Sequence, residues 1–412
     1  MRKLLLTAAL GAAASGAPAA QQPSRPMTRA DSIDKARADS IALMRALQNA
    51  TARSSPAQPG PGTGPTNPRL LPDFSAVGDL VGDLSPNGST QEDKTRFGVR
   101  EVELAVQAVV DPYFRGDVFL GISDLEKISI EQAFLTTTAI EDLEIRMGRQ
   151  LMPFGKQNTT HRHDLHTIEY PWVIQRFFAA DGLKGTGVYA SKVFAPFGWY
   201  QELIVTANDR LGEGPEGLVT SEPVNKELTG LTYSARLRNY WDVNESTNFE
   251  LSASGMTGRL EQPLSTTNTG GVNAVGARQS TVAADLTFRW RPLQQGLYQS
   301  FILQTEVMHQ INERITGPTY AGPTQDYTGA YVFARYQLSQ RLFLGGRFDY
   351  VQDPVAAGGT LTAGSGYLEW FPSEFSKLSA GYERLNQADV PGVNRILVQA
   401  SFALGPHKPH PF

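Results

Sequence analysis

Apolar and polar residues alternate, one by one, through most of the sequence after about Asp73. The clearest stretch is 101–108, where valine, leucine and alanine occupy the even positions and glutamate, alanine and glutamine the odd ones. Successive side chains of a β-strand point to opposite faces, so such a strand has one apolar face and one polar face. The same alternation recurs at 143–148, 231–238, 282–291, 330–337 and 342–350.

Two all-β architectures fit this alternation. In a soluble sandwich or barrel the apolar face points into a core and the charged face points outward. In a transmembrane barrel the apolar face meets lipid and the polar face lines the lumen. The second is favoured because the charged faces recur over more strands than one sandwich uses. Aromatic residues also lie near the predicted strand ends, as interfacial girdles do. These residues are Tyr240, Trp241, Trp290, Tyr350, Trp370 and Phe371.

The predicted strands number about sixteen, and fourteen or eighteen would also fit. An antiparallel barrel of this size encloses an aqueous lumen, so it implies passage of small solutes. A helical-bundle membrane protein is excluded, since the mean hydropathy is −0.28 and no long apolar run follows the N-terminus. The predicted segments are 74–82, 98–111, 113–123, 128–138, 141–150, 183–194, 198–208, 229–241, 247–258, 280–291, 299–312, 328–340, 342–352, 360–371, 376–386 and 395–404.

The N-terminus, residues 1–20, has the build of a secretory signal peptide. Arg2 and Lys3 precede a short apolar stretch, and Ala17-Pro18-Ala19 offers a cleavage site between small residues. An ordinary N-terminal helix is the alternative. A signal peptide on a barrel sequence places the protein in the outer membrane of a diderm bacterium, in contact with outer-membrane lipids.

Two further segments precede the barrel. Residues 27–54 lack glycine and proline and favour helix, with a weak heptad seam that fits either a trimerising periplasmic coiled coil or a frayed helix. Residues 55–72 are rich in proline and glycine, as expected of a linker. The barrel is then assigned to residues 73–412.

Composition excludes several functional classes. The chain has no cysteine, so neither disulfides nor cysteine metal sites are available. A net charge of −4 gives no reason to expect a nucleic-acid partner. We expect no cofactor and no enzymatic activity: no Gly-x-Ser-x-Gly elbow occurs, and His309 stands alone on a strand as a wall residue. A lipase-like barrel and a plugged structural barrel are the alternative functions.

The C-terminal segment carries an assembly signal. Residues 395–404 alternate with Ile396, Val398 and Phe402 on one face, and the chain ends at Phe412. An apolar last strand with a terminal aromatic resembles the signal read by the barrel-assembly machinery, with Phe402 or Phe412 as the candidate aromatic. The tail histidines His407 and His410 are interpreted as solvated rather than metal-binding.

Residues 143–155 resemble a known family. They contain the Gly-Arg-x-x-x-Pro-Phe-Gly pattern, from Gly148 to Gly155, that is typical of the phosphate-selective porin O and P family. That family includes coiled-coil-bearing, dicarboxylate-associated relatives. The resemblance implies a sixteen-stranded, trimeric porin whose long third loop folds into the pore, and it suggests anions such as phosphate or dicarboxylates as solutes.

The segment that would form this loop runs from Leu151 to about Gly182. Its aromatic content favours an ordered loop. Three interpretations of its histidine-rich centre remain, in decreasing preference: a partly cationic constriction, a solvated face, and a metal site of three imidazoles and a carboxylate. Its charged residues are Lys156, His161, Arg162, His163, Asp164, His166, Glu169 and Arg176.

The strand alternation also predicts which charges face the lumen. Guanidinium groups match carboxylate and phosphate geometry, so the arginines favour anions. Carboxylates of the same parity could instead pair with them and brace the wall. The expected lumen arginines are Arg146, Arg236, Arg238, Arg289, Arg291, Arg335 and Arg347. The acids of the same face are Glu101, Glu103, Glu131, Glu144, Glu202, Glu250, Asp285, Glu306 and Glu369.

Overall fold

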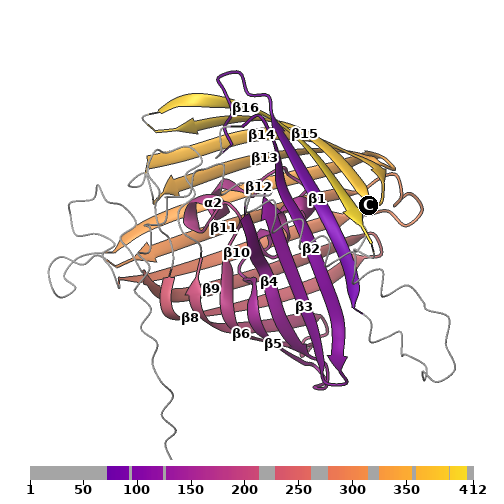
Figure 1. Ribbon diagram of the computed structural model, residues 1–412, viewed down its shortest axis with the longest axis vertical. Coiled ribbons are helices and arrows are strands. Elements are labelled where there is room, and N and C mark those ends of the chain that lie inside the picture. Colours follow the sequence, from indigo (N-terminus) through magenta and orange to yellow (C-terminus); the bar gives the residue numbers. More distant parts are fainter. Residues whose placement is uncertain are drawn as a thin grey trace, which may run out of the picture.

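A computed structural model describes residues 72–91, 95–123, 127–212, 228–260, 277–313, 324–354, 359–388 and 390–405. The predicted signal peptide, the helical segment, the linker up to residue 71 and the histidine-containing tail lie outside these residues. Sixteen strands of the described chain form one closed antiparallel barrel, in which each strand pairs with the next and β1 pairs with β16 (Figure 1). The predicted fold class and strand number are therefore confirmed.

The strands follow the predicted segments closely. The largest difference is at β16, which begins at Val390 because Val390 already pairs with Gln387 of β15. The strands are β1 (Asp73–Asp83), β2 (Phe97–Asp111), β3 (Phe114–Ser123), β4 (Lys127–Thr137), β5 (Leu143–Leu151), β6 (Lys184–Phe194), β7 (Tyr200–Leu211), β8 (Leu228–Asn244), β9 (Thr247–Leu260), β10 (Arg278–Trp290), β11 (Phe301–Asn312), β12 (Gln325–Ser339), β13 (Leu342–Asp353), β14 (Gly359–Ser373), β15 (Ser376–Gln387) and β16 (Val390–Leu404).

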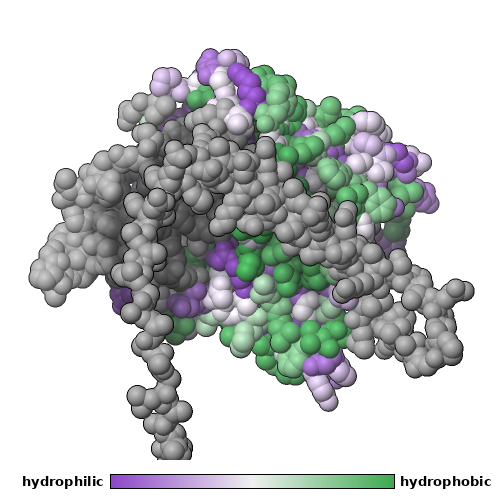
Figure 2. Space-filling model, viewed as in Figure 1, coloured by the Kyte–Doolittle hydropathy of each residue, from purple (hydrophilic) through white to green (hydrophobic). Residues whose placement is uncertain are grey.

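The wall is apolar outside and polar inside. On β8, Leu231 is 64% exposed while the next residue, Thr232, is 0% exposed, and Tyr233 and Arg236 continue the contrast. Burial is the reverse of that in a soluble protein, because the apolar side chains cover the outer surface. Figure 2 shows these hydrophobic residues over the outer surface of the strands where grey segments do not cover it. This is the surface that a lipid-facing barrel presents.

Aromatic rings form a row near the end of the barrel that carries the short turns. Trp241, Phe249, Phe288 and Phe301 lie on four successive strands, with neighbouring ring centroids 5.1 to 6.2 Å apart. Exposed aromatics in the turns after even-numbered strands extend this belt. Phe371 differs from expectation: it is buried and packs edge-on against Phe343 at 5.5 Å. The row matches the interfacial girdle predicted from sequence.

The connection between β5 and β6, residues 152–183, folds into the barrel and is called the inserted loop. It contains two 3₁₀ turns, η2 (Gln157–Thr159) and η3 (Arg162–Asp164), and the helix α2 (Trp172–Phe177). Figure 1 shows α2 inside the ring of strands, where it contacts β12 and β13. Among the described residues, no helix is long and apolar enough to cross a membrane.

The hydrophobic core lies inside the barrel. Loop residues such as Phe154, Trp172 and Phe177 pack in one cluster with inward-facing Leu211 and Leu385 of the wall. Several of the wall residues in this cluster lie at the strand ends nearest the long connections. The alternation in the sequence predicts a polar lumen throughout. The inner surface near the long connections is apolar because its side chains pack against the apolar side chains of the inserted loop.

Candidate functional site

A side-chain amide closes the neck of the inserted loop. Asn158 is fully buried, and its Nδ2 donates to the carbonyl oxygens of Met152 and Leu183, at 2.8 and 3.0 Å. The backbone N–H of Leu183 donates back to Asn158 Oδ1 at 2.6 Å. The two ends of the loop are thus bonded to one another, and buried backbone groups that leave the wall obtain partners.

Gly155, the last residue of the Gly-Arg-x-x-x-Pro-Phe-Gly pattern, brings the loop backbone against the opposite wall. Its N–H donates to Ser254 Oγ on β9 at 3.1 Å, and its φ is +65°. A Cβ at this position would lie 1.5 Å from Oε1 of Glu306 on β11. Only glycine combines this φ with so close an approach.

Replacing Gly155 by alanine is therefore expected to displace the loop from β9 and β11. Strain at positive φ costs about 1 kcal/mol, and the contact with Glu306 adds to it. Trypsin accessibility of Lys156 in the refolded barrel, followed by mass spectrometry, measures the displacement. Gly198→Ala is the matched control, since Gly198 has φ +83° but an added Cβ meets nothing within 4 Å. Equal cleavage in both variants would contradict the role given to Gly155.

A buried ionic network fastens the loop to the part of the wall formed by β15 and β16. Glu169 pairs with Arg395 of β16 at 2.8 Å, and Arg395 also pairs with Glu383 of β15 at 2.8 Å. Lys377 of β15 donates to the carbonyl oxygens of His163 and Leu165, at 2.7 and 2.9 Å. All the charged side chains here are buried. Removing one partner would leave the other charge unpaired away from water.

Helix α2 is anchored to β13 in the same way. Its first N–H, from Trp172, donates to Asp349 Oδ1 at 2.9 Å, and Arg176 Nε donates to Asp353 Oδ2 at 2.7 Å. Arg347 of the same strand pairs with Asp349 at 2.7 Å and donates to the carbonyl oxygen of Glu169 at 2.8 Å. Arg347 and Arg176 therefore serve as loop anchors, with their guanidinium groups buried.

These charged and buried surroundings shift the pKa values of two loop residues, Glu169 and His166. Burial raises the pKa of Glu169, but the positive charges of Arg395, Arg162 and Arg100 have the larger effect and lower this pKa to about 2. Glu383 is the other carboxylate that pairs with Arg395. Burial lowers the pKa of His166 well below 6.5. The positive charges of Arg335, Lys377 and Arg289 lower this pKa further, whereas the negative charge of Asp164 raises it. The ring of His166 stacks on Phe333 at 6.1 Å, and its Nδ1 lies 4.0 Å from Glu369.

Four of the predicted anion-contact residues converge on one carboxylate, Glu250 of β9. Its distances to the cationic nitrogens are 2.7 Å for Lys156, 3.4 Å for Arg238, 3.5 Å for Arg289 and 3.8 Å for Arg236. Glu202 pairs with Arg238 at 2.6 Å and Asp285 pairs with Arg236 at 3.2 Å. We call these seven residues the cationic cluster, since four cations face three carboxylates.

The cationic cluster keeps part of its charge open to the lumen. The side chains of Lys156, Arg238 and Arg289 are 22%, 30% and 33% exposed, whereas Arg236 is 3% exposed. Three groups are therefore accessible from the lumen, while the fourth is buried against the wall. Arg289 lies next to Trp290, the last residue of β10, so the cluster is on the short-turn side of the inserted loop.

The remaining predicted arginines have other surroundings. Arg335 is buried, pairs with Glu369 at 2.8 Å and stacks on Phe343 at 3.7 Å. Arg162 pairs with Asp181. Arg146 is 32% exposed, pairs with Glu144 at 2.8 Å and lies near two aromatic rings. Arg291 corrects the expectation: it follows β10 in the turn and donates to the Gly296 carbonyl oxygen, so it is outside the lumen wall.

The loop histidines do not act as one group. His161 and His163 lie together, with ring centroids 5.4 Å apart, facing Glu103 of β2. His166 lies apart, over Phe333 of β12. A metal site built from all three imidazoles and Asp164, the least preferred interpretation of the sequence, therefore does not form. Burial lowers the pKa of His163.

Comparison with known proteins places the fold among outer-membrane barrels. No family model matches the sequence. A curated relative, an uncharacterized protein of Aquifex aeolicus, is 23% identical in an alignment of 345 positions that covers 78% of this chain and 71% of that protein.

Three solved structures are similar at 10% sequence identity. DcaP, an outer-membrane channel of Acinetobacter baumannii, has a TM-score of 0.53 over 83% of this chain and 99% of that chain. Salmonella typhi OmpF, in complex with daunomycin, has 0.52 over 83% and 100%. OmpT, an outer-membrane protein of Vibrio cholerae in its trimer form, has 0.51 over 81% and 99%. At this identity the likeness shows the fold alone, which this chain shares with barrels of the outer membrane.

Proposed function

We propose that this protein is an outer-membrane porin of a diderm bacterium, through which small hydrophilic solutes diffuse with a preference for anions. The cationic cluster is the observation that carries the proposal. Its three part-exposed cations face the lumen beside the inserted loop, and selectivity in such pores is set by the charges lining the narrowest part. The similarity of the fold to an outer-membrane channel supports the passage of solutes.

The finer parts of the proposal rest on the sequence. The Pro-Phe-Gly pattern supports membership of the phosphate-selective porin O and P family, with phosphate or dicarboxylates as solutes. The signal peptide and the last strand support export and insertion by the barrel-assembly machinery. A homotrimer is proposed from the family resemblance and from the trimer form of one similar barrel. A coiled coil at residues 27–54 would add to the contacts between subunits.

Liposome swelling tests the proposal directly. Proteoliposomes are expected to swell faster in succinate than in an uncharged sugar of similar size, because the cationic cluster attracts the dianion. The comparison uses isosmotic solutions and protein-free liposomes as the baseline. Equal swelling rates would contradict the anion preference but leave the porin function intact.

A plugged structural barrel is a second candidate, favoured by the hydrophobic core that fills the long-loop end of the lumen. The two functions differ in whether solutes pass the docked loop. No swelling with the wild-type protein, but rapid swelling after deletion of residues 157–181, would establish the plug. Similar permeation before and after deletion would reject it.

Docking of the loop is expected to weaken in acid. Glu169 has a pKa of about 2 when docked and about 4.5 when released, so its stabilisation is complete above pH 4.5 and is lost as the pH falls toward 2. His166, with a docked pKa well below 6.5, takes up a proton on release below pH 6.5 and acts in the same direction. Conductance fluctuations should therefore increase as the pH falls below 6.5, where His166 acts, and increase further below pH 4.5, where Glu169 also acts. In a Glu169→Gln, His166→Gln double variant the conductance fluctuations should increase less steeply as the pH falls. The same pH dependence in the double variant and the wild type would show that these two residues do not cause it.

A further inference from the structure

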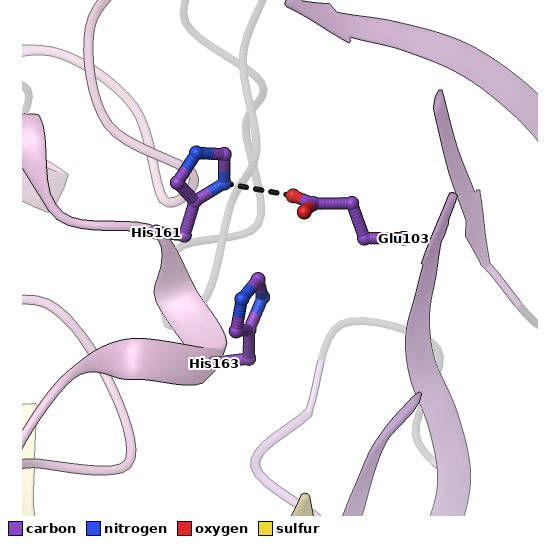
Figure 3. A group of neighbouring side chains, drawn as sticks. All are labelled: Glu103, His161 and His163. Carbon is purple, nitrogen blue, oxygen red and sulfur yellow. Dashed lines mark ion pairs between the residues drawn. The ribbon is translucent and has the colours of Figure 1, made fainter. Parts of the chain in front are cut away.

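A compact donor set joins the inserted loop to the wall opposite the cationic cluster. Glu103 projects from β2, while His161 and His163 project from the loop on either side of Arg162 (Figure 3). One ligand atom from each residue lies within 4.8 Å of the others. His161 Nδ1 is 2.7 Å from Glu103 Oε2. Atoms at these separations can share one small cation after modest side-chain adjustment.

The surroundings hold these residues in place. Lys377 fixes the backbone of η3 through the His163 and Leu165 carbonyl oxygens, and Phe119 packs against His161 at 5.4 Å. Arg162 is turned toward Asp181, so the two histidines face Glu103 together. His163 and Glu103 are 1% and 2% exposed, whereas the His161 side chain is 23% exposed. The set is thus preorganised, with one side reachable from the lumen.

We propose that Glu103, His161 and His163 bind a divalent transition-metal cation, for which Zn²⁺ is the representative. Two imidazoles and one carboxylate suit zinc in tetrahedral coordination and leave a fourth position for water or another ligand. Asp164, whose Oδ1 is 3.7 Å from His163 Nε2, is the nearest additional carboxylate. Calcium and magnesium prefer oxygen ligands and are not expected to bind here.

Gln132 of β4 determines which ring nitrogen carries the proton in neutral His161 in the absence of the ion. Its Oε1 accepts the Leu151 N–H at 3.1 Å, so its Nε2, 2.7 Å from His161 Nε2, must donate. His161 Nε2 therefore accepts, and Nδ1 carries the proton toward Glu103. A cation bound at Nδ1 displaces this proton, Nε2 becomes the protonated nitrogen, and the Gln132 amide must turn over. Gln132→Glu would remove this cost, because a carboxylate accepts from both Nε2–H and the Leu151 N–H.

Titration of Zn²⁺ into the refolded, EDTA-treated full chain tests the site. His407→Asn and His410→Asn are introduced in every sample to remove the tail imidazoles. We expect saturation at one ion per chain. His163→Ala and Glu103→Gln should each weaken binding by about tenfold or more, while His309→Ala, on β11, should leave it unchanged. Co²⁺ in place of Zn²⁺ should give a tetrahedral absorption spectrum that His163→Ala abolishes.

Gln132→Glu is expected to tighten Zn²⁺ binding, a gain that a misfolded barrel cannot produce. This gain should disappear when His163→Ala is added, which separates coordination from a general attraction to the added charge. Binding that survives both His163→Ala and Glu103→Gln, or the absence of saturable binding in folded wild-type protein, would overturn the proposal. The readout is independent of permeation, so it is separate from the test of the porin function.

Discussion

Replacing Arg395 by methionine is expected to destabilise the barrel by about 3–5 kcal/mol, because buried Glu169 and Glu383 lose their shared cation. Arg395 is 2% exposed and bonds both carboxylates at 2.8 Å. Methionine keeps much of the volume beside Trp172, so loss of charge pairing dominates over loss of packing. This loss of stability is measured as the difference in the free energy of urea unfolding between the wild type and the variant in lipid vesicles.

Arg115→Met is the matched control for Arg395→Met. Arg115 also pairs with a carboxylate, Asp117, at 2.8 Å, but its side chain is 47% exposed. Removal of an exposed pair should cost roughly 0–1 kcal/mol. Trypsin cleavage at Arg162 and Arg176 should increase only in the Arg395 variant, since Arg395 contacts the loop through Glu169 and Arg115 does not. Equal losses of stability in the two variants would show that the buried network does not hold the loop.

Exchanging Arg238 and Arg289 for glutamate is expected to reverse the ion selectivity of the pore. The double variant changes the cationic cluster from four cations and three carboxylates to two cations and five carboxylates. Both side chains are about one third exposed, so the new charges face the lumen. The chloride-to-potassium permeability ratio should fall from above one to below one, and the change should diminish at high salt.

Arg291→Glu is the control for this charge reversal. Arg291 lies two residues beyond Arg289 but belongs to the turn after β10, where it bonds the Gly296 carbonyl oxygen. The same change of charge at this position should leave the permeability ratio near that of the wild type. A comparable shift from both variants would mean that selectivity arises from the overall charge of the barrel rather than from the cationic cluster.

The strand pattern could be predicted from the sequence because the residues of each strand alternate between apolar positions that face the lipid and polar positions that face the lumen. Leu231, Thr232 and Tyr233 differ in polarity as the lipid and the lumen differ, and this holds without knowledge of any neighbour. The turns follow where the alternation stops. The number and order of strands therefore needed only local information.

The site required information that no single strand contains. Parity alone assigns Arg238, Arg335 and Arg347 alike to the lumen, yet Arg335 is buried against Glu369 and Phe343 while Arg238 remains reachable. Which arginine stays open depends on where the inserted loop packs. Parity also places Arg395 opposite Ile396, facing inward, but its partner Glu169 is 226 residues away in the chain. Pairing over that separation follows from the closed barrel, which sequence patterns do not specify.

Planar-bilayer recording of the refolded wild-type protein in a KCl gradient tests the central claim most directly. An anion-preferring porin with a docked loop should give discrete conductance steps, in groups of three for a trimer, and a reversal potential displaced toward that of chloride. A protein that is folded and inserted but gives no steps would contradict the porin function and leave the plugged barrel and the lipase-like barrel as the functions to test.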